Sequence, residues 1–387
     1  MEYLKLKDVA DIYLGLTHTP KYVDSGIPFL SVKDISGGNI DFSNCHYITE
    51  EEYNTLPKGA KPECGDMLFC RVGTIGKPII IEENVPKFGS FVSLGFLRRK
   101  NNEILLNYLK YWMNSNLFYK QVKQNVKGVA QINLNTAWLK EFNIPNVSLK
   151  EQKNIVDKLS KVDKMICIKK NEIEKLNQLI KSQFVEMFVN KEYSKITVED
   201  VCEKMKIGPF GSALHKNEIS TSGDVFVLGT DNAVDNEFKV YEQRFITTEK
   251  FKELEKYKVA AGDIIISMMG TIGRTSVIPV DFYPSIISSH LCMLTSYPNK
   301  MDPYFLNCIL ILDDNISHQI NINKKGAIMS GLNLGIIKKL QIPNVPIEEQ
   351  KKFLNIKNQI DKQKFEFEKS LKKLEELQAS LMQEYFG

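Results

Sequence analysis

Two segments of the chain carry hydrophobic residues at the spacing of a long helix and contain no residue that would break one. Residues 150–189 and 348–386 have neither glycine nor proline, and their apolar side chains recur every three or four positions. The first segment forms two heptad rows, Leu159, Ile166, Ile173, Ile180 and Met187 in one and Ile155, Val162, Lys169, Leu176 and Gln183 in the other. The second forms the row Phe353, Ile360, Phe367, Leu374 and Leu381. Rows of this length favour a coiled coil over an amphipathic helix lying on a domain.

The remaining chain has the pattern of domains that mix strands and helices. Residues 1–149 and 191–347 hold all the prolines and every glycine except Gly387. They contain short β-rich runs, for example at 27–32, 67–72, 225–228 and 264–268. Helical spacing predicts helices at 104–122 and 302–320. Each part is large enough to bury its own core, so the predicted fold class is α+β, with two mixed α/β domains and two long helices.

An internal repeat organises these parts. Residues 65–76 align with residues 262–273 at an offset of 197, with 6 of 12 positions identical, and both end in Gly-Thr-Ile-Gly. Residues 142–153 align with 340–351 at an offset of 198, with 7 of 12 identical. We therefore predict the order domain 1–149, helix 150–190, domain 191–347, helix 348–387. A tandem duplication closes most simply with pseudo-twofold symmetry, which would make the helices an antiparallel coiled coil.

Charge and cysteine content limit the function classes. The formal net charge is only +4, and the two domains outside the long helices hold 34 basic and 33 acidic residues. A strong basic excess, typical of a stand-alone nucleic-acid binder, is therefore absent. The chain starts without the apolar stretch of a signal peptide and has no apolar run long enough to cross a membrane. Seven scattered cysteines without a C-x-x-C pair are typical of reduced thiols, so we expect a cytoplasmic protein.

The sequence has no recognisable catalytic or metal-binding constellation. It contains no G-x-G-x-x-G and no G-x-x-x-x-G-K-[ST] motif, and its five histidines lie far apart without metal-ligand spacing. Asp66 and Asp263 recur in Gly-Asp pairs, where a nuclease carboxylate is one interpretation. We favour an Asp that caps the turn before a strand. We expect no catalytic residue, no metal and no cofactor on this chain.

Polar residues in the predicted loops suit nucleic acid better, because Arg, Lys, Asn, Gln, Ser and Thr bond phosphates and base edges. The candidates flank both Gly-Thr-Ile-Gly turns, follow the first strands and precede the long helices. They are His18, Lys21, Tyr22, Lys33, Arg71, Thr74, Lys77, Lys127, Gln131, Asn133, His215, Lys216, Thr271, Arg274, Lys324, Lys325, Ser330 and Asn333. Since the charge excess is small, we expect DNA to be read by local patches.

The ordered set of motifs resembles the specificity subunit of type I restriction–modification enzymes over essentially the whole chain. The resemblance rests on Asp8-Val9 with Thr19-Pro20, the strand at 26–35, both Gly-Thr-Ile-Gly turns, and the Ile-Pro-x-Val-x-[Leu/Ile]-x-Glu-Gln segments at 144–152 and 342–350. The family usually has consecutive prolines before Glu-Gln, whereas Val147-Ser148 and Val345-Pro346 stand there in this chain. The second domain opens with residues 207–214, Ile-Gly-Pro-Phe-Gly-Ser-Ala-Leu, and differs there from the first.

The resemblance implies a protein that recognises DNA and is not itself an enzyme. Each target-recognition domain would read one half of a bipartite, asymmetric site in double-stranded DNA, and the helices would form the spacer. Two methyltransferase subunits, which bind S-adenosylmethionine, would dock on that spacer, and an ATP-driven restriction subunit can join them. Two other classes stay open from the residues alone: a coiled-coil scaffold without DNA readout, and a methyltransferase or nuclease in its own right.

Overall fold

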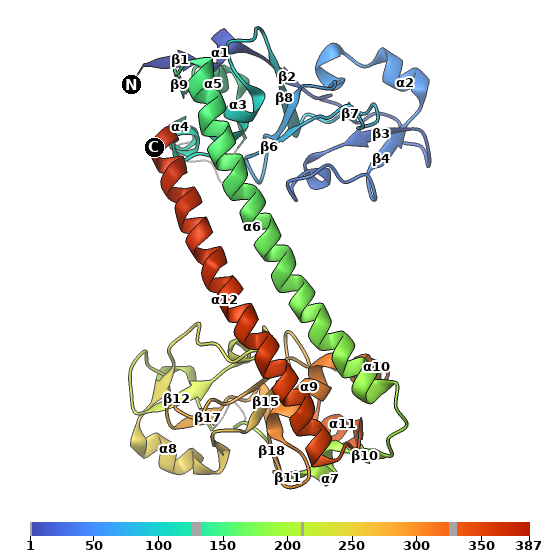
Figure 1. Cartoon of the computed structure of the whole chain (residues 1–387), viewed down its shortest axis with the longest axis vertical. Coiled ribbons are helices and arrows are strands. Elements are labelled where there is room, and N and C mark those ends of the chain that lie inside the picture. The colour runs from blue at the N-terminus through green and yellow to red at the C-terminus, as the bar shows by residue number, and fades with distance from the viewer. Residues whose placement is uncertain (1, 126–132, 210–212, 325–330) are drawn as a thin grey trace. The chain divides into compact units, whose positions relative to one another are not determined.

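The computed structural model describes residues 2–125, 133–209, 213–324 and 331–387. The chain divides into two compact units (Figure 1). The first comprises residues 1–170 and 368–387, and the second comprises residues 171–367. Each unit therefore contains one mixed domain together with part of both long helices.

The first unit is built on an antiparallel sheet with the strand order β2-β8-β5-β6. Its strands are β2 (Ala10–Leu14), β8 (Leu94–Arg99), β5 (Met67–Cys70) and β6 (Gly76–Ile80). A smaller sheet has the order β4-β3-β7, with β4 (His46–Ile48), β3 (Ile27–Leu30) and β7 (Gly89–Ser90). A short pair joins β1 (Tyr3–Lys5) to β9 (Asn143–Pro145). This pair brings the start of the domain beside the segment that leads into the first long helix.

Four helices pack with the larger sheet in one core cluster, and a fifth lies beside the smaller sheet. The four are α1 (Leu6–Val9), α3 (Leu106–Met113), α4 (Asn116–Asn125) and α5 (Thr136–Lys140), and the fifth is α2 (Glu50–Thr55). Trp112 and Tyr108 of α3 are fully buried, in one cluster with Met67 and Phe69 of β5. The Trp112 indole also donates to the Asn143 carbonyl at 2.9 Å. The core of this domain thus lies between α3 and the sheet.

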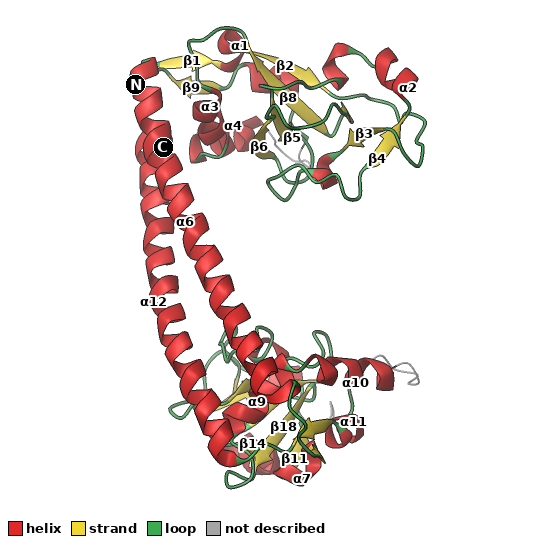
Figure 2. Ribbon diagram, turned by 45° about the vertical axis from the view of Figure 1, so that its right-hand side comes forward, coloured by secondary structure: helices red, strands yellow, loops and turns green. Residues whose placement is uncertain are grey.

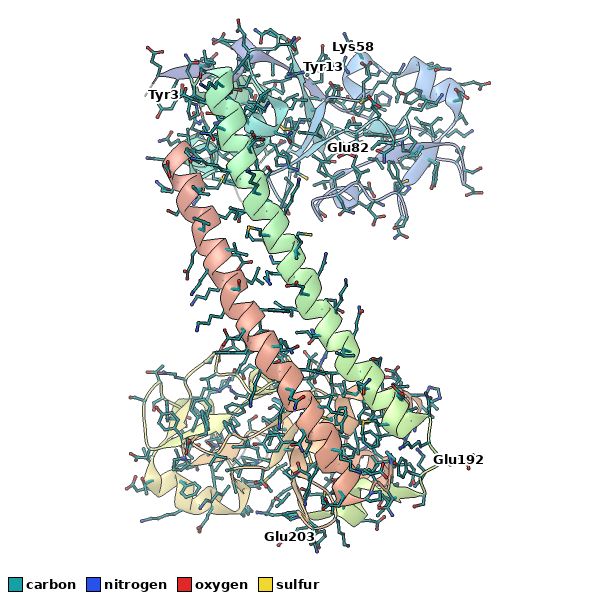
Figure 3. All side chains as sticks on the ribbon, viewed as in Figure 1. Tyr3, Tyr13, Lys58, Glu82, Glu192 and Glu203 are labelled. Carbon is teal, nitrogen blue, oxygen red and sulfur yellow. The ribbon has the colours of Figure 1, made fainter. Side chains whose placement is uncertain are left out.

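Tyr13 attaches a separate turn to the outer strand of the same sheet. Its ring stacks on Phe96 with the centroids 4.9 Å apart, and the Arg98 guanidinium lies 5.4 Å from its centroid. The Lys58 ammonium, on the 3-10 turn Lys58–Ala60, lies 5.9 Å from the same centroid (Figure 3). Cations near an aromatic face are attracted by its quadrupole, so these contacts fix the turn against β2.

The second unit repeats this topology. Its sheets have the orders β11-β18-β15-β16 and β13-β12-β17-β14, with a short pair β10-β19. The strands are β10 (Lys195–Thr197), β11 (Cys202–Ile207), β12 (Val225–Leu228), β13 (Phe245–Ile246), β14 (Lys258–Val259), β15 (Ile264–Ser267), β16 (Thr275–Val277), β17 (Ser285–Ile287), β18 (Leu291–Ser296) and β19 (Gln341–Pro343). The helices are α7 (Val198–Val201), α8 (Thr248–Leu254), α9 (Pro303–Leu312), α10 (Asp314–Lys324) and α11 (Leu334–Lys339). The predicted duplication and the α+β class are confirmed.

The two helices predicted at 104–122 and 302–320 differ from the structure in the same way. Each is a pair of helices, α3 with α4 and α9 with α10. In the first pair the Ser115 hydroxyl donates to the Trp112 carbonyl and accepts from the Phe118 amide. In the second pair Asp313 accepts from the Asn315 amide at 2.9 Å. A polar side chain that bonds the backbone ends one helix and caps the next, which hydrophobic periodicity alone does not reveal.

The long helices are α6 (Leu149–Phe184), followed by a π-helical turn (Val185–Val189), and α12 (Ile347–Phe386). Figure 2 shows each as an unbroken rod. Within the first unit, Lys158 contacts Tyr385 and Lys170 pairs with Glu375, so the helices run antiparallel there. Within the second unit, Phe184 packs on Phe353. Among the described residues, neither rod has the apolar stretch that a membrane-spanning helix needs.

Burial confirms most of the predicted heptad seam and corrects its end. Leu159, Val162 and Ile166 are buried. At the end of the first helix Phe184 and Phe188 are buried instead, whereas Met187 is only half-buried. The shift begins at Phe184, within the α-helix, and the π-helical turn Val185–Val189 contains Phe188.

A buried glutamine attaches each long helix to its domain. The side-chain oxygen of Gln152 accepts from the Leu105 amide at 2.9 Å, and its nitrogen donates to the carbonyls of Glu103 and Val147 at 2.9 and 3.1 Å. Gln350 repeats this pattern with the amide of Asp302 and the carbonyls of Lys300 and Val345, at 2.9, 3.0 and 2.8 Å. The Glu-Gln motif of the sequence therefore has a structural cause.

We predict that Gln350→Leu lowers the free energy of unfolding by about 3 kcal/mol, because it leaves three buried backbone groups without partners. Gln363→Leu is the matched control, since Gln363 is exposed on the same helix and should change stability by less than about 0.5 kcal/mol. Urea unfolding of the full chain measures both. Equal effects would contradict the attachment role.

Thiol labelling should report the same burial pattern. Cys64 and Cys167 are exposed and the other five cysteines are buried. Burial raises the pKa of Cys70 to about 11 and those of Cys202, Cys292 and Cys308 to about 12, so these thiols stay protonated and unreactive at pH 8. A thiol reagent should modify two cysteines quickly, and Cys64→Ser with Cys167→Ser should abolish the fast phase. A fast phase that persists in the double variant would show that a buried thiol is accessible.

Candidate nucleic-acid interface

The hairpin turn between β5 and β6 presents two of the predicted residues on a fixed frame. Gly73 has φ of 70°, a conformation that glycine adopts without steric penalty. Ile75 is buried in the turn, and its carbonyl accepts the Tyr119 hydroxyl at 3.1 Å. Because the turn is held from its inner side, Thr74 and Lys77 remain exposed at its surface.

Arg71 connects this turn to two neighbouring loops. Its side chain is only 8% exposed. Nε donates to the Leu134 carbonyl at 3.0 Å, Nη1 to the Val92 carbonyl at 2.7 Å and Nη2 to the Asn133 side-chain oxygen at 3.2 Å. The Leu134 amide in turn donates to the Arg71 carbonyl at 2.9 Å. Two predicted residues, Arg71 and Asn133, are thus hydrogen-bonded to each other. The buried Arg71 side chain supports the exposed turn from its inner side.

The equivalent turn in the second unit is braced by a different side chain. The Ser267 hydroxyl accepts from the Arg274 amide at 3.0 Å and donates to the Thr271 carbonyl. Thr271 and Arg274 are exposed, as their counterparts are in the first unit. The Leu332 amide donates to the Met268 carbonyl at 3.0 Å, which matches the bond between Leu134 and Arg71. The turn and its neighbouring loop are therefore joined in the same way twice.

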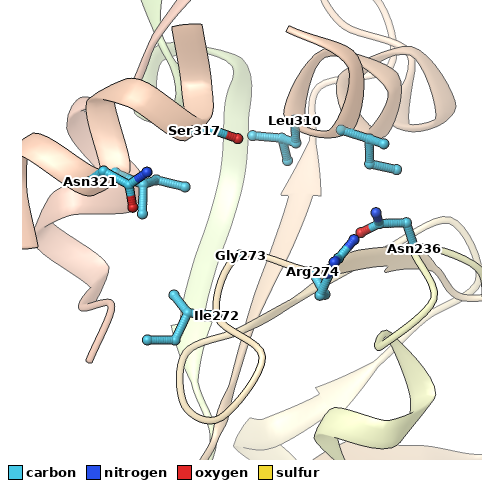
Figure 4. A pocket seen from close by; sticks show the side chains of 9 residues that line it. Asn236, Ile272, Gly273, Arg274, Leu310, Ser317 and Asn321 are labelled. Carbon is cyan, nitrogen blue, oxygen red and sulfur yellow. The ribbon is translucent and has the colours of Figure 1, made fainter. Parts of the chain in front are cut away.

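Arg274 also borders a cleft of about 300 Å³ within the second unit (Figure 4). Asn236, Ser317 and Asn321 supply polar groups to its lining, and Leu310 supplies part of the apolar wall. Guanidinium, amide and hydroxyl groups are the donors that bond phosphates and base edges. The cleft extends the polar surface around the second turn.

An aromatic pair lies in the first loop of the first unit. The Tyr22 ring stacks on the His46 ring with the centroids 4.2 Å apart, and 38% of Tyr22 remains exposed. Burial of its hydroxyl, with a smaller effect of Asp34, raises the pKa of Tyr22, so this residue is a neutral donor near pH 7. His18 and Lys21 in the same loop are exposed.

Other predicted residues lie at turns and helix ends. The Lys33 ammonium donates to the Asn44 carbonyl at 3.4 Å. The His215 amide donates to the Glu218 carboxylate at 2.6 Å, at the start of the 3-10 turn Lys216–Glu218, and His215 and Lys216 are exposed. These side chains are accessible, and the hydrogen bonds described here belong to the local structure.

Asn333 caps a helix: its side-chain oxygen accepts from the Ile336 amide at 2.9 Å at the start of α11. Such a cap stabilises the loop that precedes it. Lys127, Gln131, Lys325 and Ser330 lie outside the described residues, as does the side chain of Lys324. Their part in the interface stays a prediction.

The two recurrent aspartates have the turn-capping role that we favoured. Asp66 accepts from the Glu63 amide at 2.8 Å and forms a two-bond ion pair with Arg98. Asp263 accepts from the Ala260 amide at 2.7 Å and from the Thr295 hydroxyl at 2.6 Å. Burial raises the pKa of Asp263, although both hydrogen bonds oppose the shift.

Sequence reasoning missed two exposed residues beside the second turn. His290 is exposed, and its carbonyl accepts from the Met268 amide at 2.8 Å. Met269 is 47% exposed at the tip of the turn. The internal repeat could have indicated His290, because Ser93 lies 197 residues before it at the equivalent position. The Ser93 carbonyl accepts from the Arg71 amide at 2.9 Å, as the His290 carbonyl accepts from the Met268 amide.

Comparison with known proteins decides the family. The model of the type I restriction modification DNA specificity domain matches twice, over residues 1–178 and 190–379. The chain belongs to this family. The resemblance inferred from the repeated motifs is thereby confirmed, and the two matches follow the internal duplication.

Individual relatives and solved structures agree with this membership. The chain is 26% identical over 407 residues to the MjaX specificity subunit assigned to a type I restriction enzyme of Methanocaldococcus jannaschii, covering 96% of this chain and 91% of the relative. It is 26% identical over 148 residues to the type I restriction enzyme EcoBI specificity subunit of Escherichia coli, covering 38% and 31%. The crystal structure of a type I restriction-modification S subunit from M. genitalium has a similar fold, with 16% identity, a TM-score of 0.56 and coverage of 100% and 96%. A second structure, from a study of complex assembly in a type I system, gives 14% identity, a TM-score of 0.60 and coverage of 100% and 97%.

In this specificity domain, Lys77 carries both an exposed cation and an unusual backbone, and the two can be separated. Its φ is 53°, whereas Arg274 at the equivalent turn is not among the described residues with positive φ. We predict that Lys77→Gly is more stable than Lys77→Ala by about 1 kcal/mol, because alanine retains the left-handed strain. Both variants should lower the slope of log affinity against log salt by about one.

Position 274 is the matched control. There the order of stability should reverse, with Arg274→Gly less stable than Arg274→Ala by about 0.5–1 kcal/mol. Thermal unfolding and salt-dependent DNA binding of the four variants test both statements. The same order at both positions would contradict the assigned role of the backbone.

Proposed function

We propose that this chain is the DNA-recognition subunit of a type I restriction–modification complex, in which each domain reads one half of a bipartite site in double-stranded DNA. The observation that carries the proposal is the repeated interface. In each unit an exposed turn with a cation, Lys77 or Arg274, is hydrogen-bonded to the loop that precedes the long helix. Two similar readers on one chain suit a target with two separate halves.

Local chemistry supports DNA as the partner although bulk charge is nearly neutral. Lys77 and Arg274 are exposed where a phosphate can approach, and Thr74, Thr271 and the lining of the second cleft offer groups that bond base edges. The two turns therefore supply the cations that position the backbone and the polar groups that specify sequence.

We infer that the chain itself is not catalytic. The recurrent carboxylates Asp66 and Asp263 are occupied by capping bonds, which leaves them a structural role. Methylation would then belong to two methyltransferase subunits that hold S-adenosylmethionine, and an ATP-driven restriction subunit would join the complex where DNA is cleaved.

The outer faces of the long helices support docking of those subunits. In the first unit, Met165, Ile168 and Leu377 are 52%, 55% and 46% exposed. In the second unit, Leu179 and Phe365 are 42% and 63% exposed. Large apolar side chains in solvent mark interaction surfaces when they gather on one element. Residues 150–190 and 348–387 would thus form the spacer that sets the gap between half-sites and binds the methyltransferase.

Methylome sequencing of cells with and without this chain tests the proposal. We expect adenine methylation at one bipartite motif that disappears when the chain is deleted and returns with a plasmid copy. Methylation that does not depend on the chain would favour a scaffold without DNA readout, and methylation by the purified chain alone would favour an enzyme.

Exchange of one domain gives a sharper prediction. Replacing residues 191–347 with the corresponding domain of another family member should change one half of the methylated motif and leave the other half intact, because each domain has its own core. The reciprocal exchange of residues 1–149 is the control and should change the opposite half. A motif altered in both halves by one exchange would contradict two independent readers.

A further inference from the structure

Arg71 is a buried cation, and the hydrogen bonds of its side chain use only some of its N–H donors. A guanidinium has five N–H donors, and Arg71 makes three side-chain hydrogen bonds, to Leu134, Val92 and Asn133. All three acceptors are neutral. The bonds fix the position of the charge without neutralising it.

In the part of the chain that the structure describes, no acidic side chain compensates this charge. Among the described residues, Arg71 has no ion pair, in contrast to Arg98 with Asp66 and Arg244 with Asp231. Residues 126–132, which directly precede Asn133 in the sequence and are not among the described residues, include no Asp or Glu. Burial accordingly lowers the pKa of Arg71. An uncompensated buried charge is unfavourable, so a counter-charge from a ligand would be strongly favoured there.

The position of Arg71 determines which ligand can supply that counter-charge. The residue precedes the turn that exposes Thr74 and Lys77, and it bonds the Asn133 side chain at the surface. A charge in a protein interior is screened less than one in water, so its field extends to the exposed rim of the turn. An anion bound at that rim would contact Lys77 directly. It would also be attracted by the positive charge of Arg71 without touching that side chain.

The second unit lacks this charge. The repeat places Met268 at the position of Arg71, and the Ser267 hydroxyl braces the turn in its place. Lys77 and Arg274 are both exposed cations, so the aligned segments 65–77 and 262–274 differ by the single positive charge of Arg71. The second turn has no buried cation at the corresponding position.

We propose that Arg71 is a positioning residue that makes the first domain the stronger, more salt-dependent anchor on the DNA backbone, while the second domain binds its half-site with one phosphate interaction fewer. This inference rests on the proposed function and deepens it, because it assigns unequal roles to two readers of the same fold. The ligand class is a phosphodiester of double-stranded DNA.

The test uses the full chain, the duplex motif found by methylome sequencing, two duplexes in which one half-site is scrambled, and one duplex in which both are scrambled. Affinity is measured against salt concentration for wild type, Arg71→Met and Arg71→Lys. On the duplex that retains only the first domain's half-site, Arg71→Met should lower the log–log salt slope by about one and weaken binding about tenfold at ~150 mM salt. Arg71→Lys should keep the wild-type slope because it keeps the charge.

Arg99→Met is the matched control. Arg99 is half-buried in the first unit and, like Arg71, donates to a backbone carbonyl, that of Ile104, at 3.2 Å. It lies at the opposite end of β8 from Leu94, which pairs with Cys70 beside the turn. Its replacement should leave the slope unchanged, and thermal unfolding of each variant verifies that the domain is folded.

Two results would overturn the inference: a wild-type slope for Arg71→Met, or a slope for Arg71→Lys that falls as far as that of Arg71→Met. The second result would mean that only the geometry of the guanidinium matters. Failure of the proposed function is a separate outcome, since wild-type chain would then show no preference for the intact motif over the doubly scrambled duplex.

Discussion

The attachment of each long helix to its domain through one buried glutamine is the constraint on which the rest of the structure depends. The turns before α3 and α9 and the segments that lead into the long helices contain backbone groups that belong to no helix or strand ladder, and such groups must be paired where they are buried. The amides of Gln152 and Gln350 each pair one backbone N–H and two carbonyls across the junction. A leucine would fill the same space but pair none of them. The orientation of each domain on its part of the helices is therefore set by hydrogen-bond geometry, which is directional, as well as by apolar packing, which is not.

A fixed orientation matters for the proposed interface, which has few charges. The domains are close to neutral, so long-range attraction would contribute little, and binding would depend on the positions of single cations. Lys77 and Arg274 stand on turns whose inner residues are held by the core. The loop before each helix is bonded to the turn by the Leu134 and Leu332 amides. The chain between each of these leucines and the long helix, with α5 and β9 or α11 and β19, therefore connects the turn, the domain core and the start of the helix.

Sequence patterns predicted the parts of this arrangement that repeat and missed those that rest on single side chains. Heptad spacing located the long helices, and the constant offset located two equivalent domains. The split of each predicted domain helix depends on one polar residue, Ser115 or Asp313, that bonds the backbone. The seam shift at Phe184 and Phe188 brings both side chains into one cluster with Phe305 and Phe353, which are far away in the sequence. For Arg71 the residue type favoured DNA contact, but its burial is a tertiary property: the acceptors Val92 and Leu134 lie 21 and 63 residues away, and no local pattern reports such distances.

Duplication followed by divergence explains why the frame is repeated and the side chains are not. The backbone bonds that shape the two turns involve no particular side chain, so they survive substitution at the exposed and bracing positions. Met268 stands at the position that corresponds to Arg71, and the Ser267 hydroxyl braces the second turn. Val72 and Ser93 could likewise differ from Met269 and His290, since the equivalent carbonyl still accepts the equivalent amide. A reader of a new DNA half-site can thus arise by changing side chains on the turn while the core, the loop and the glutamine attachment remain as they are.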